Sequence, residues 1–427
     1  MVNLATDSAT APMQVGAVLL FESDAGFDVG SAKRALAERL STIPRMRQRL
    51  QGAPFACGRP FWIDDDRFDP ADRIQIENCP EPGDRDAVLA RAARLIERRL
   101  DPSRPLWSAT FIRGMARDQN ALIVLFHHVM SDGIGGLAML TRLVDGVEAV
   151  GPPAGVSQAP PGTLALLVDA WRERVGSFLD WRGLQRRVRG TFAAIGPARR
   201  NPAPLTSLNR PIGTRRRFEV VQADLGAVHA VARSHGATVN DLVLTVVAFS
   251  LRELLLGRGE SLDHIVASVP VSRRTAATTH ALGNDVGVAP MVVSTVGDVW
   301  DCLEATAAMS RQLKAIPKDG DLFAPFARVL GRMHLIKPFL DRQHMINTLV
   351  TNVRGPGERL SFLGTPISDA IPLSVVTGNI TVAFAVLSYA GTLTITLVAD
   401  PETCPELPVL REAIARHLME VSAVVGG

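Results

Sequence analysis

The sequence is poor in cysteine. Its 427 residues include only four, Cys57, Cys79, Cys302 and Cys404, and no two of them stand in Cys-x-x-Cys spacing. Such scattered cysteines argue against a disulfide framework and against a structural zinc site. They fit a reducing compartment, so we expect a cytoplasmic protein.

Long apolar runs are also absent from the sequence. A membrane-spanning helix needs about 18 or more apolar residues in succession, and no such run occurs. Residues 1–8 have neither the basic start nor the apolar block of a signal peptide. We therefore expect a soluble protein, or one that attaches to a membrane only at its periphery.

Charge of one sign is not in excess either. The formal net charge is +3, which does not indicate a nucleic-acid-binding protein. The apolar content of 47% and the charged content of 21% are typical of a globular protein with sizeable cores. A chain of 427 residues is long for one core, so two domains are expected.

The first part of the chain alternates strand-like and helix-like segments. Apolar spacing predicts strands at 13–22, 107–113 and 121–126, and helices at 31–50, 84–100 and 134–148. Helices interleaved with strands indicate an α/β or α+β layered domain, which we place at residues 1–150.

Residues 151–205 differ in composition from the segments on either side. Residues 151–162 are rich in Pro and Gly and read as a linker, and 163–196 read as basic amphipathic helices. Two interpretations of these helices remain open. The basic face contacts anionic lipid, or the helices dock on the protein and their arginines are solvated; the second is the more ordinary.

The second half, 206–427, repeats the mixture of strands and helices at similar scale. The patterns predict helices at 238–256 and 300–315, strands at 264–270 and 287–294, and a hairpin formed by 380–386 and 393–398. No sequence repeat relates the two halves. A two-domain enzyme with its site in the cleft between them is consistent with this pattern.

The most informative segment is the apolar run at 121–126. It ends abruptly in His127 and His128, and Asp132 and Gly133 follow closely. Six apolar residues stopped by a polar cluster predict a buried strand that brings side chains to a loop. Because histidine takes up and returns a proton near neutral pH, the pair is a candidate catalytic site.

A metal site is the first alternative for the pair. Adjacent histidines on an extended backbone point to opposite sides, so they rarely bind one ion together. The zinc motif with two histidines four residues apart and a Glu between them is also missing. We therefore predict no metal.

The remaining alternatives are a serine hydrolase and a pair of core histidines. No Gly-x-Ser-x-Gly elbow occurs, so covalent catalysis has no support in the sequence. Two histidines beside Asp132 and Gly133 at a strand end do not favour the core interpretation. What remains is one histidine acting as general base in a direct transfer. Asp132 orients either the loop, by pairing with a buried arginine, or the imidazole itself; the sequence prefers neither.

The segment 127–133 resembles the active-site motif of CoA-dependent acyltransferases and peptide-synthetase condensation domains. Further segments are similar to motifs of the bacterial wax ester synthase/acyl-CoA:diacylglycerol acyltransferase family. They are Pro105-Leu106-Trp107, Thr238-Val239-Asn240-Asp241, 269–274, 282–287 and Thr351-Asn352-Val353-Arg354-Gly355-Pro356. These matches run in order along almost the whole chain.

The resemblance implies two chloramphenicol-acetyltransferase-like domains around a central cleft or tunnel. His128 would be the general base that deprotonates an acceptor hydroxyl, and the hydroxyl would attack the acyl-CoA thioester without an acyl-enzyme. His127, Asp132 and Gly133 complete this motif. Asn240, Asn352 and Ser131 would help to bind substrate, whereas Pro105, Trp107 and Asp241 would be structural. Helix caps are often Asn or Asp, so a structural role for Asn240 stays open.

The resemblance implies no cofactor, with acyl-CoA as a substrate and a lipid hydroxyl as its acceptor. A peripheral membrane or lipid-droplet surface is a further candidate partner. The implied reaction makes triacylglycerol or wax ester. Two other functions remain: a condensation-type acyltransferase that acts on a secondary-metabolite or glycolipid hydroxyl, and a lipid-binding relative without turnover.

The sequence departs from the family at three places. Residues 1–11 lack the usual segment that contains Pro-Leu-Asp, which in the family helps to form the acyl or acceptor end of the pocket. Arg113 and Arg354 stand where an acidic residue and Pro are common. None of these departures alters the histidine motif, so they bear on the choice of acceptor.

Overall fold

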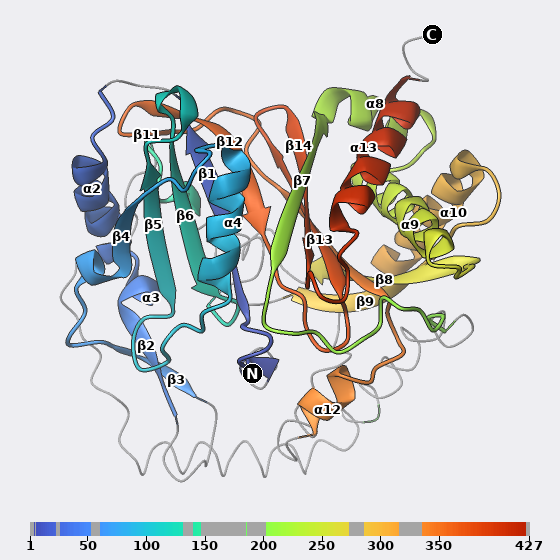
Figure 1. Ribbon diagram of the computed structural model, residues 1–427, viewed down its shortest axis with the longest axis horizontal. Helices are drawn as coiled ribbons and strands as arrows, with labels where there is room; N and C mark the ends of the chain where they lie inside the picture. The colour runs from blue at the N-terminus through green and yellow to red at the C-terminus, as the bar shows by residue number, and fades with distance from the viewer. Residues whose placement is uncertain are drawn as a thin grey trace.

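The computed structural model describes residues 4, 6–22, 26–52, 60–130, 140–146, 185, 202–272, 286–315 and 335–423. Within these ranges the chain forms two six-stranded sheets, which lie side by side in Figure 1, and one two-stranded sheet. We call the six-stranded sheets the first sheet and the second sheet. The mixed α/β class expected from the sequence is confirmed.

The first sheet has the strand order β11-β12-β1-β6-β5-β4. Its strands are β1 (Gln14–Phe21), β4 (Ile74–Asn78), β5 (Trp107–Arg113), β6 (Asn120–His127), β11 (Ser361–Phe362) and β12 (Thr365–Leu373). All neighbours are antiparallel except β4 and β5, which are parallel. Helix α2 (Val29–Ser41) and helix α4 (Arg85–Ile96) complete this half.

Both faces of the first sheet are covered, which explains the continuous apolar run of β6. Leu122 and Val124 pack in the same core as Leu36 and Leu40 of α2. The alternate residues of β6 pack in a second core with Val88, Ala92 and Ile96 of α4. A strand that is buried on two faces does not alternate apolar with polar residues. The whole of β6 after Asn120 is accordingly buried.

The second sheet has the order β7-β14-β13-β10-β8-β9. Its strands are β7 (Arg217–Asp224), β8 (His264–Ser272), β9 (Val286–Ser294), β10 (Thr348–Arg354), β13 (Val382–Tyr389) and β14 (Thr392–Ala399). Its helices are α8 (Leu225–Ser234), α9 (Val239–Gly257), α10 (Val299–Ala315), α12 (Ile336–Leu340) and α13 (Leu407–Ala423). The predicted hairpin is confirmed: β13 and β14 pair through a turn at Ala390 and Gly391, both with positive φ.

The sheets do not follow the two contiguous halves of the sequence. Strands β11 and β12 come late in the chain, yet β12 pairs with β1 and so extends the first sheet. One apolar core also contains residues of both sheets, among them Val18 and Leu125 of the first and Val220 and Ala383 of the second. This core and the crossing strands hold the two sheets together.

The predicted helix over 31–50 is wrong in its second part. Helix α2 ends at Ser41, and the chain continues as a short helix α3 (Pro44–Arg47) and strand β2 (Gln48–Gln51), which pairs with β3 (Phe61–Asp64). Proline forces the residue before it into an extended conformation, and Ile43 is extended with ψ of 109°. The helix therefore cannot run through Pro44.

Most other predicted elements are confirmed with small shifts in their ends. The strand predicted at 107–113 is β5, the helix predicted at 84–100 is α4, and the helix predicted at 238–256 is α9. The linker at 151–162 lies outside the described residues, as do almost all of the basic helices at 163–196 and most of the helix at 134–148. Among the described helices, none is long and apolar enough to cross a membrane.

Candidate active site

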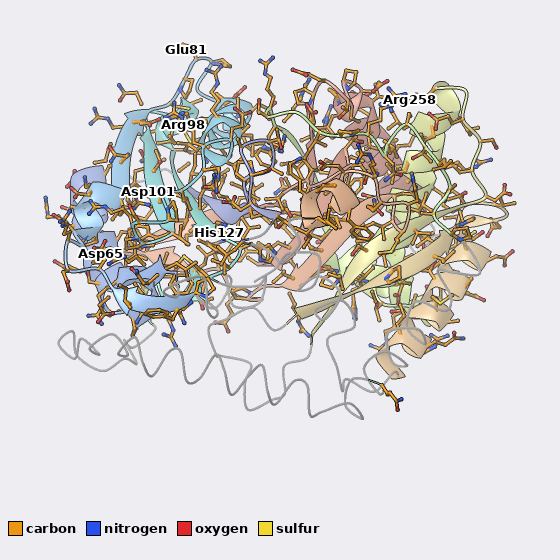
Figure 2. The ribbon with its side chains drawn as sticks, turned by 90° about the horizontal axis from the view of Figure 1, so that it is seen from below. Asp65, Glu81, Arg98, Asp101, His127 and Arg258 are labelled. Atoms are coloured by element: carbon orange, nitrogen blue, oxygen red, sulfur yellow. The ribbon has the colours of Figure 1, made fainter. Side chains whose placement is uncertain are left out.

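The histidine pair stands at the end of β6, which lies inside the first sheet between β1 and β5. Figure 2 shows His127 near the boundary between the two halves. Two neighbouring segments hold the backbone here. The N–H of His127 donates to the carbonyl of Leu106 at 2.9 Å, and the N–H of His128 donates to the carbonyl of Met13 at 2.7 Å. The strand end is therefore fixed from both sides.

The ring of His127 belongs to the protein interior, where it is 2% exposed. Its Nδ1 accepts a hydrogen bond from the N–H of Val129 at 3.0 Å. In a neutral ring the proton is then on Nε2, which lies 3.7 Å from Oδ2 of Asp7. That separation is too long for a hydrogen bond but suits electrostatic attraction. Both ring nitrogens of His127 are thus directed at protein groups.

Asp7 connects several parts of this strand end. Its Oδ1 accepts from the N–H of Met13 at 3.0 Å, and its Oδ2 accepts from Nη2 of Arg99 at 2.6 Å and from Nε of Arg99 at 3.0 Å. Burial by itself raises the pKa of Asp7. The contacts with His127, Met13 and Arg99 outweigh burial and lower the pKa below its ordinary value. Asp7 therefore stays charged among partners that favour its charge.

The sequence interpretation missed Asp7. The sequence of residues 1–11 bears only on the choice of acceptor through its missing Pro-Leu-Asp pattern, and no local pattern connects residue 7 with residue 127. An acidic residue within a few positions of the predicted first strand was the only signal available. The structure shows that the short N-terminal segment does contribute a carboxylate at the histidine motif.

His128 differs from His127 in its surroundings, because its side chain is only half-buried. His128 is the first residue of the turn that follows β6, in which the N–H of Met130 donates to the carbonyl of His127 at 2.9 Å, so the two rings do not share one environment. Ser131, Asp132 and Gly133, which were predicted to act with the pair, lie outside the described residues.

The Pro-Leu-Trp segment supports the strand that leads to the histidines. Trp107 is fully buried, and its indole N–H donates to the carbonyl of Met46 at 2.8 Å. Arg73 donates to the carbonyls of Pro105 and Trp107, at 2.9 Å and 2.8 Å. Trp107 also pairs in register with Phe126, the residue before His127. Pro105 and Trp107 therefore serve packing and hydrogen bonding.

The Asn-Asp pair stands at the start of α9. Thr238 caps this helix: its hydroxyl accepts from the N–H of Asp241, and Oδ2 of Asp241 accepts from the N–H of Thr238 at 2.9 Å. Such a reciprocal capping box satisfies two helix N–H groups that otherwise have no partner. Asp241 is 2% exposed, and its carboxylate is used to cap the N-terminus of α9. Asn240 is half-buried beside it.

Asn352 lies on β10, where it pairs with Val386 of the parallel strand β13, and it is half-buried. Asn240 and Asn352 both lie in the part of the structure that contains the second sheet, whereas His127 and His128 lie at the end of a strand of the first sheet.

Within the described ranges, no three His, Cys, Asp or Glu side chains gather in a group that could hold a metal ion. Cys79, Cys302 and Cys404 are free thiols.

Comparison with solved structures shows that this arrangement of sheets occurs in other proteins. The chain superimposes on the wax ester synthase/diacylglycerol acyltransferase from Marinobacter aquaeolei VT8 with a TM-score of 0.72 at 23% identity, covering 100% of this chain and 98% of the other. It is also similar to the first condensation domain of the calcium-dependent antibiotic synthetase, with a TM-score of 0.63 at 16% identity over 96% of this chain and 92% of the other. These likenesses establish the fold.

The family follows from the sequence. Residues 1–243 match the wax ester synthase/diacylglycerol acyltransferase catalytic domain, and residues 282–422 match the C-terminal domain of the same family. The chain therefore belongs to the wax ester synthase/diacylglycerol acyltransferase family of acyltransferases. It is 28% identical to the probable diacylglycerol O-acyltransferase tgs1 of Mycobacterium tuberculosis (strain H37Rv), over 96% of this chain and 92% of that protein. The resemblance noted in the sequence is confirmed at the level of the family.

Proposed function

We propose that this protein transfers a fatty acyl group from acyl-CoA to the hydroxyl of diacylglycerol or of a long-chain alcohol, with His128 as the general base. The relatives named as diacylglycerol O-acyltransferases support the substrate class. The observation that supports the choice of base is the position of His127. Its two ring nitrogens are directed at Val129 and Asp7 inside the protein, so proton transfer falls to the half-buried His128.

The proposed reaction is a direct transfer. The imidazole of His128 takes the proton of the acceptor hydroxyl while the hydroxyl oxygen attacks the thioester carbonyl carbon. The carbon–sulfur bond then breaks, and the imidazolium returns its proton to the departing CoA thiolate. The protein supplies no nucleophile of its own. General-base catalysis of this kind contributes about 10²–10⁴ to the rate.

Two features of the structure would favour such a step. The backbone of His128 is fixed by the carbonyl of Met13 at 2.7 Å, so the ring starts from a defined position. A defined position matters because a general base must reach the proton within hydrogen-bond distance. Asn240 and Asn352 are further candidates to bind substrate, since amide side chains donate hydrogen bonds to carbonyl oxygens.

The test is release of free CoA thiol from palmitoyl-CoA, with dioleoylglycerol or hexadecanol as acceptor. We expect His128→Ala to reduce turnover by about 10²–10⁴. His229→Ala removes an exposed histidine of α8 and serves as the matched control, which should keep full turnover. His128→Ala with undiminished turnover would refute the assignment of the base.

The acceptor is tested in the same assay. Thiol release with neither lipid acceptor, but with a glycolipid or secondary-metabolite alcohol, would instead support a condensation-type acyltransferase. Binding of acyl-CoA without any thiol release across the whole panel of acceptors would point to a lipid-binding protein.

A further inference from the structure

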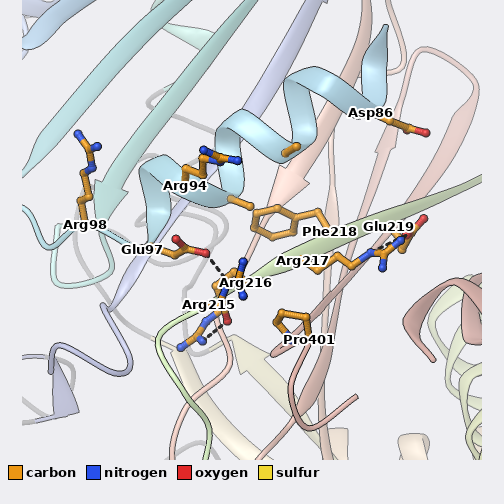
Figure 3. A pocket seen from close by; sticks show the side chains of 12 residues that line it. Asp86, Arg94, Glu97, Arg98, Arg215, Arg216, Arg217, Phe218, Glu219 and Pro401 are labelled. Carbon is orange, nitrogen blue, oxygen red and sulfur yellow. Dashed lines mark hydrogen bonds and ion pairs between the residues drawn. The ribbon is translucent and has the colours of Figure 1, made fainter. Parts of the chain in front are cut away.

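A second concave site lies away from the histidine motif, on the surface between helix α4 and strand β7. Its volume is about 690 Å³, within the range of pockets that bind small molecules. Figure 3 shows it bounded by α4, from Asp86 to the C-terminal end of the helix, on one side and by the start of β7 on the other. Neither the histidine motif nor the asparagines discussed above line this pocket.

Arginine dominates the pocket lining. Five arginines face three carboxylates, and they are Arg94, Arg98, Arg215, Arg216 and Arg217 against Asp86, Glu97 and Glu219. Two of these carboxylates already have partners. Oε1 of Glu219 lies 2.9 Å from Nη2 of Arg217, and Oε1 of Glu97 accepts from the backbone N–H of Arg216 at 2.7 Å. The pocket therefore has an excess of positive charge.

Three of the arginines have side chains that can contact a ligand. Arg94, Arg98 and Arg215 are exposed, and among the described residues none of their guanidinium groups forms an ion pair with a carboxylate. A guanidinium has five N–H donors in a fixed fork and suits phosphate oxygens. They stand at separate points of the pocket rim, Arg94 on α4, Arg98 just beyond its end and Arg215 just before β7, so each offers donors to a different part of an anionic ligand.

Arg216 adds a fixed charge to the pocket wall. It is 8% exposed, and its guanidinium donates to three backbone carbonyls, those of Gly213 at 2.9 Å, Arg215 at 2.6 Å and Thr10 at 2.5 Å. Carbonyls satisfy its hydrogen bonds, and the carboxylates of Asp400 and Glu97 offset part of its charge. A buried charge in a concave wall strengthens the local field, which attracts anions.

The pocket also has surfaces that would suit the rest of a nucleotide. Phe218 and Pro401 give it apolar lining, and Asp86, at the end of α4 opposite to Arg98, offers an acceptor for hydroxyl or amino groups. None of the large apolar side chains that the described residues expose lines the pocket. Insertion into a lipid bilayer uses such apolar anchors, so a soluble anion fits the surface better.

One chain of contacts connects the pocket with the histidine motif. The side-chain amide of Gln14 donates to the carbonyls of Ile96, at 3.1 Å, and of Arg98. Gln14 itself pairs in register with His127. The end of the pocket at Arg98 is therefore the end nearest to the last residue of β6. The proposed general base follows that residue.

We propose that this arginine-lined pocket binds the phosphorylated adenosine end of acyl-CoA, with the arginines contacting its phosphates. This inference rests on the proposed function for the identity of the donor. It goes beyond that function by assigning a place and a set of residues to donor binding. The pantetheine arm of the donor would extend from the Arg98 end past His127, the last residue of β6, to reach His128.

The experiment measures binding without turnover, by calorimetry with CoA, with 3′-dephospho-CoA and with adenosine 3′,5′-bisphosphate. The variant is Arg98→Gln combined with Arg215→Gln, both exposed positions. Loss of a charged hydrogen bond typically weakens binding by about tenfold or more. We expect the wild type to prefer CoA over 3′-dephospho-CoA and the double variant to lose that preference, with Kd for CoA raised about tenfold or more.

Three controls separate the possible causes. Arg233→Gln removes an exposed arginine of α8 and should leave all three affinities unchanged. Arg98→Lys with Arg215→Lys should restore part of the CoA affinity. The His128→Ala variant should still bind CoA, so a failure of the proposed chemistry does not affect this test.

The proposal is overturned if wild-type protein binds CoA and 3′-dephospho-CoA equally, or if the double glutamine variant keeps wild-type affinity for CoA. It is also overturned if the double variant loses only its binding to phosphatidylglycerol vesicles, because the arginines would then serve a lipid surface. A thermal melting curve confirms that each variant is folded.

Discussion

Oδ2 of Asp7 lies 3.7 Å from Nε2 of His127, and the same carboxylate accepts a hydrogen bond from the N–H of Met13. The carbonyl of Met13 in turn accepts from the N–H of His128. One acidic residue therefore acts on both histidines, on the first through its ring and on the second through its backbone. The N-terminal segment therefore helps to hold the strand end that carries the histidine pair.

We predict that Asp7→Asn lowers stability in a pH-dependent way. Because the folded state lowers the pKa of Asp7, its contribution is present above the unfolded pKa of about 3.9 and disappears as the pH falls through the folded value. The difference in unfolding free energy between wild type and variant should be about 1–3 kcal/mol near pH 7 and should shrink below about pH 4. Urea denaturation at several pH values measures it, and a pH-independent difference would contradict the prediction.

The same variant tests whether Asp7 positions His128. We expect Asp7→Asn to lower kcat while KM for acyl-CoA changes little, since the asparagine keeps an acceptor for Met13 but lacks the charge that attracts His127. Asp7→Glu should recover part of kcat. A purely structural role would lower the amount of folded protein without changing kcat per folded molecule.

The strands and helices with clear local patterns were predictable from the sequence. Strand β5, helix α9 and the hairpin of β13 and β14 follow from apolar spacing, capping residues and turn residues. The helix over 31–50 was misjudged because Leu36, Leu40 and Ile43 keep helical spacing up to the proline, and all three are buried. Apolar spacing continued into Leu50 although the backbone there is a strand.

Contacts between distant segments left no local signal. Strand β12 pairs with β1, with Leu373 opposite Gly16, and the sequence of neither strand predicts which strand it pairs with. The contact of Asp7 with His127 is of the same kind, as is the arginine pocket, which is lined by residues as far apart in the sequence as Arg98 and Arg215. The histidine motif is a prediction from a local pattern, whereas the groups that surround His127 come from distant segments and could not be predicted.

We predict that substitutions at the start of α9 separate stability from catalysis. Thr238→Ala removes the cap and should cost about 1 kcal/mol of stability with kcat nearly unchanged. Asn240→Ala leaves the capping box intact and should lower kcat about tenfold or more if the amide contacts substrate in the transition state. Urea denaturation and the thiol-release assay, run on both variants, distinguish the two. Equal kcat for Asn240→Ala and wild type would assign Asn240 to structure.

We predict that Trp107→Phe destabilises the half that contains the first sheet. The phenylalanine cannot donate to the carbonyl of Met46, which would lose its indole partner in a fully buried environment. An unsatisfied buried acceptor costs about 1–3 kcal/mol. Trp300→Phe is the matched control, because Trp300 is half-buried and stacks on His235 with ring centroids 4.3 Å apart, a contact that phenylalanine can keep. Thermal unfolding of both variants should show the larger loss for Trp107→Phe.

Gly16 of β1 offers the sharpest test of how the strand end is held. A Cβ at this position would lie 1.9 Å from the carbonyl oxygen of Val124 on β6, so Gly16→Ala must push the two strands apart. We expect a loss of about 1–3 kcal/mol in unfolding free energy. Turnover should also fall, because β1 leads back to Met13, whose carbonyl fixes the backbone of His128.

Gly257→Ala is the matched control for this change. Gly257 is the last residue of α9, and a Cβ there meets nothing within 4 Å, so alanine should stabilise the helix by about 0.4–1 kcal/mol. Urea midpoints should therefore move in opposite directions for the two variants. If Gly16→Ala kept both the wild-type midpoint and wild-type turnover, the spacing of β1 and β6 would not determine the position of His128.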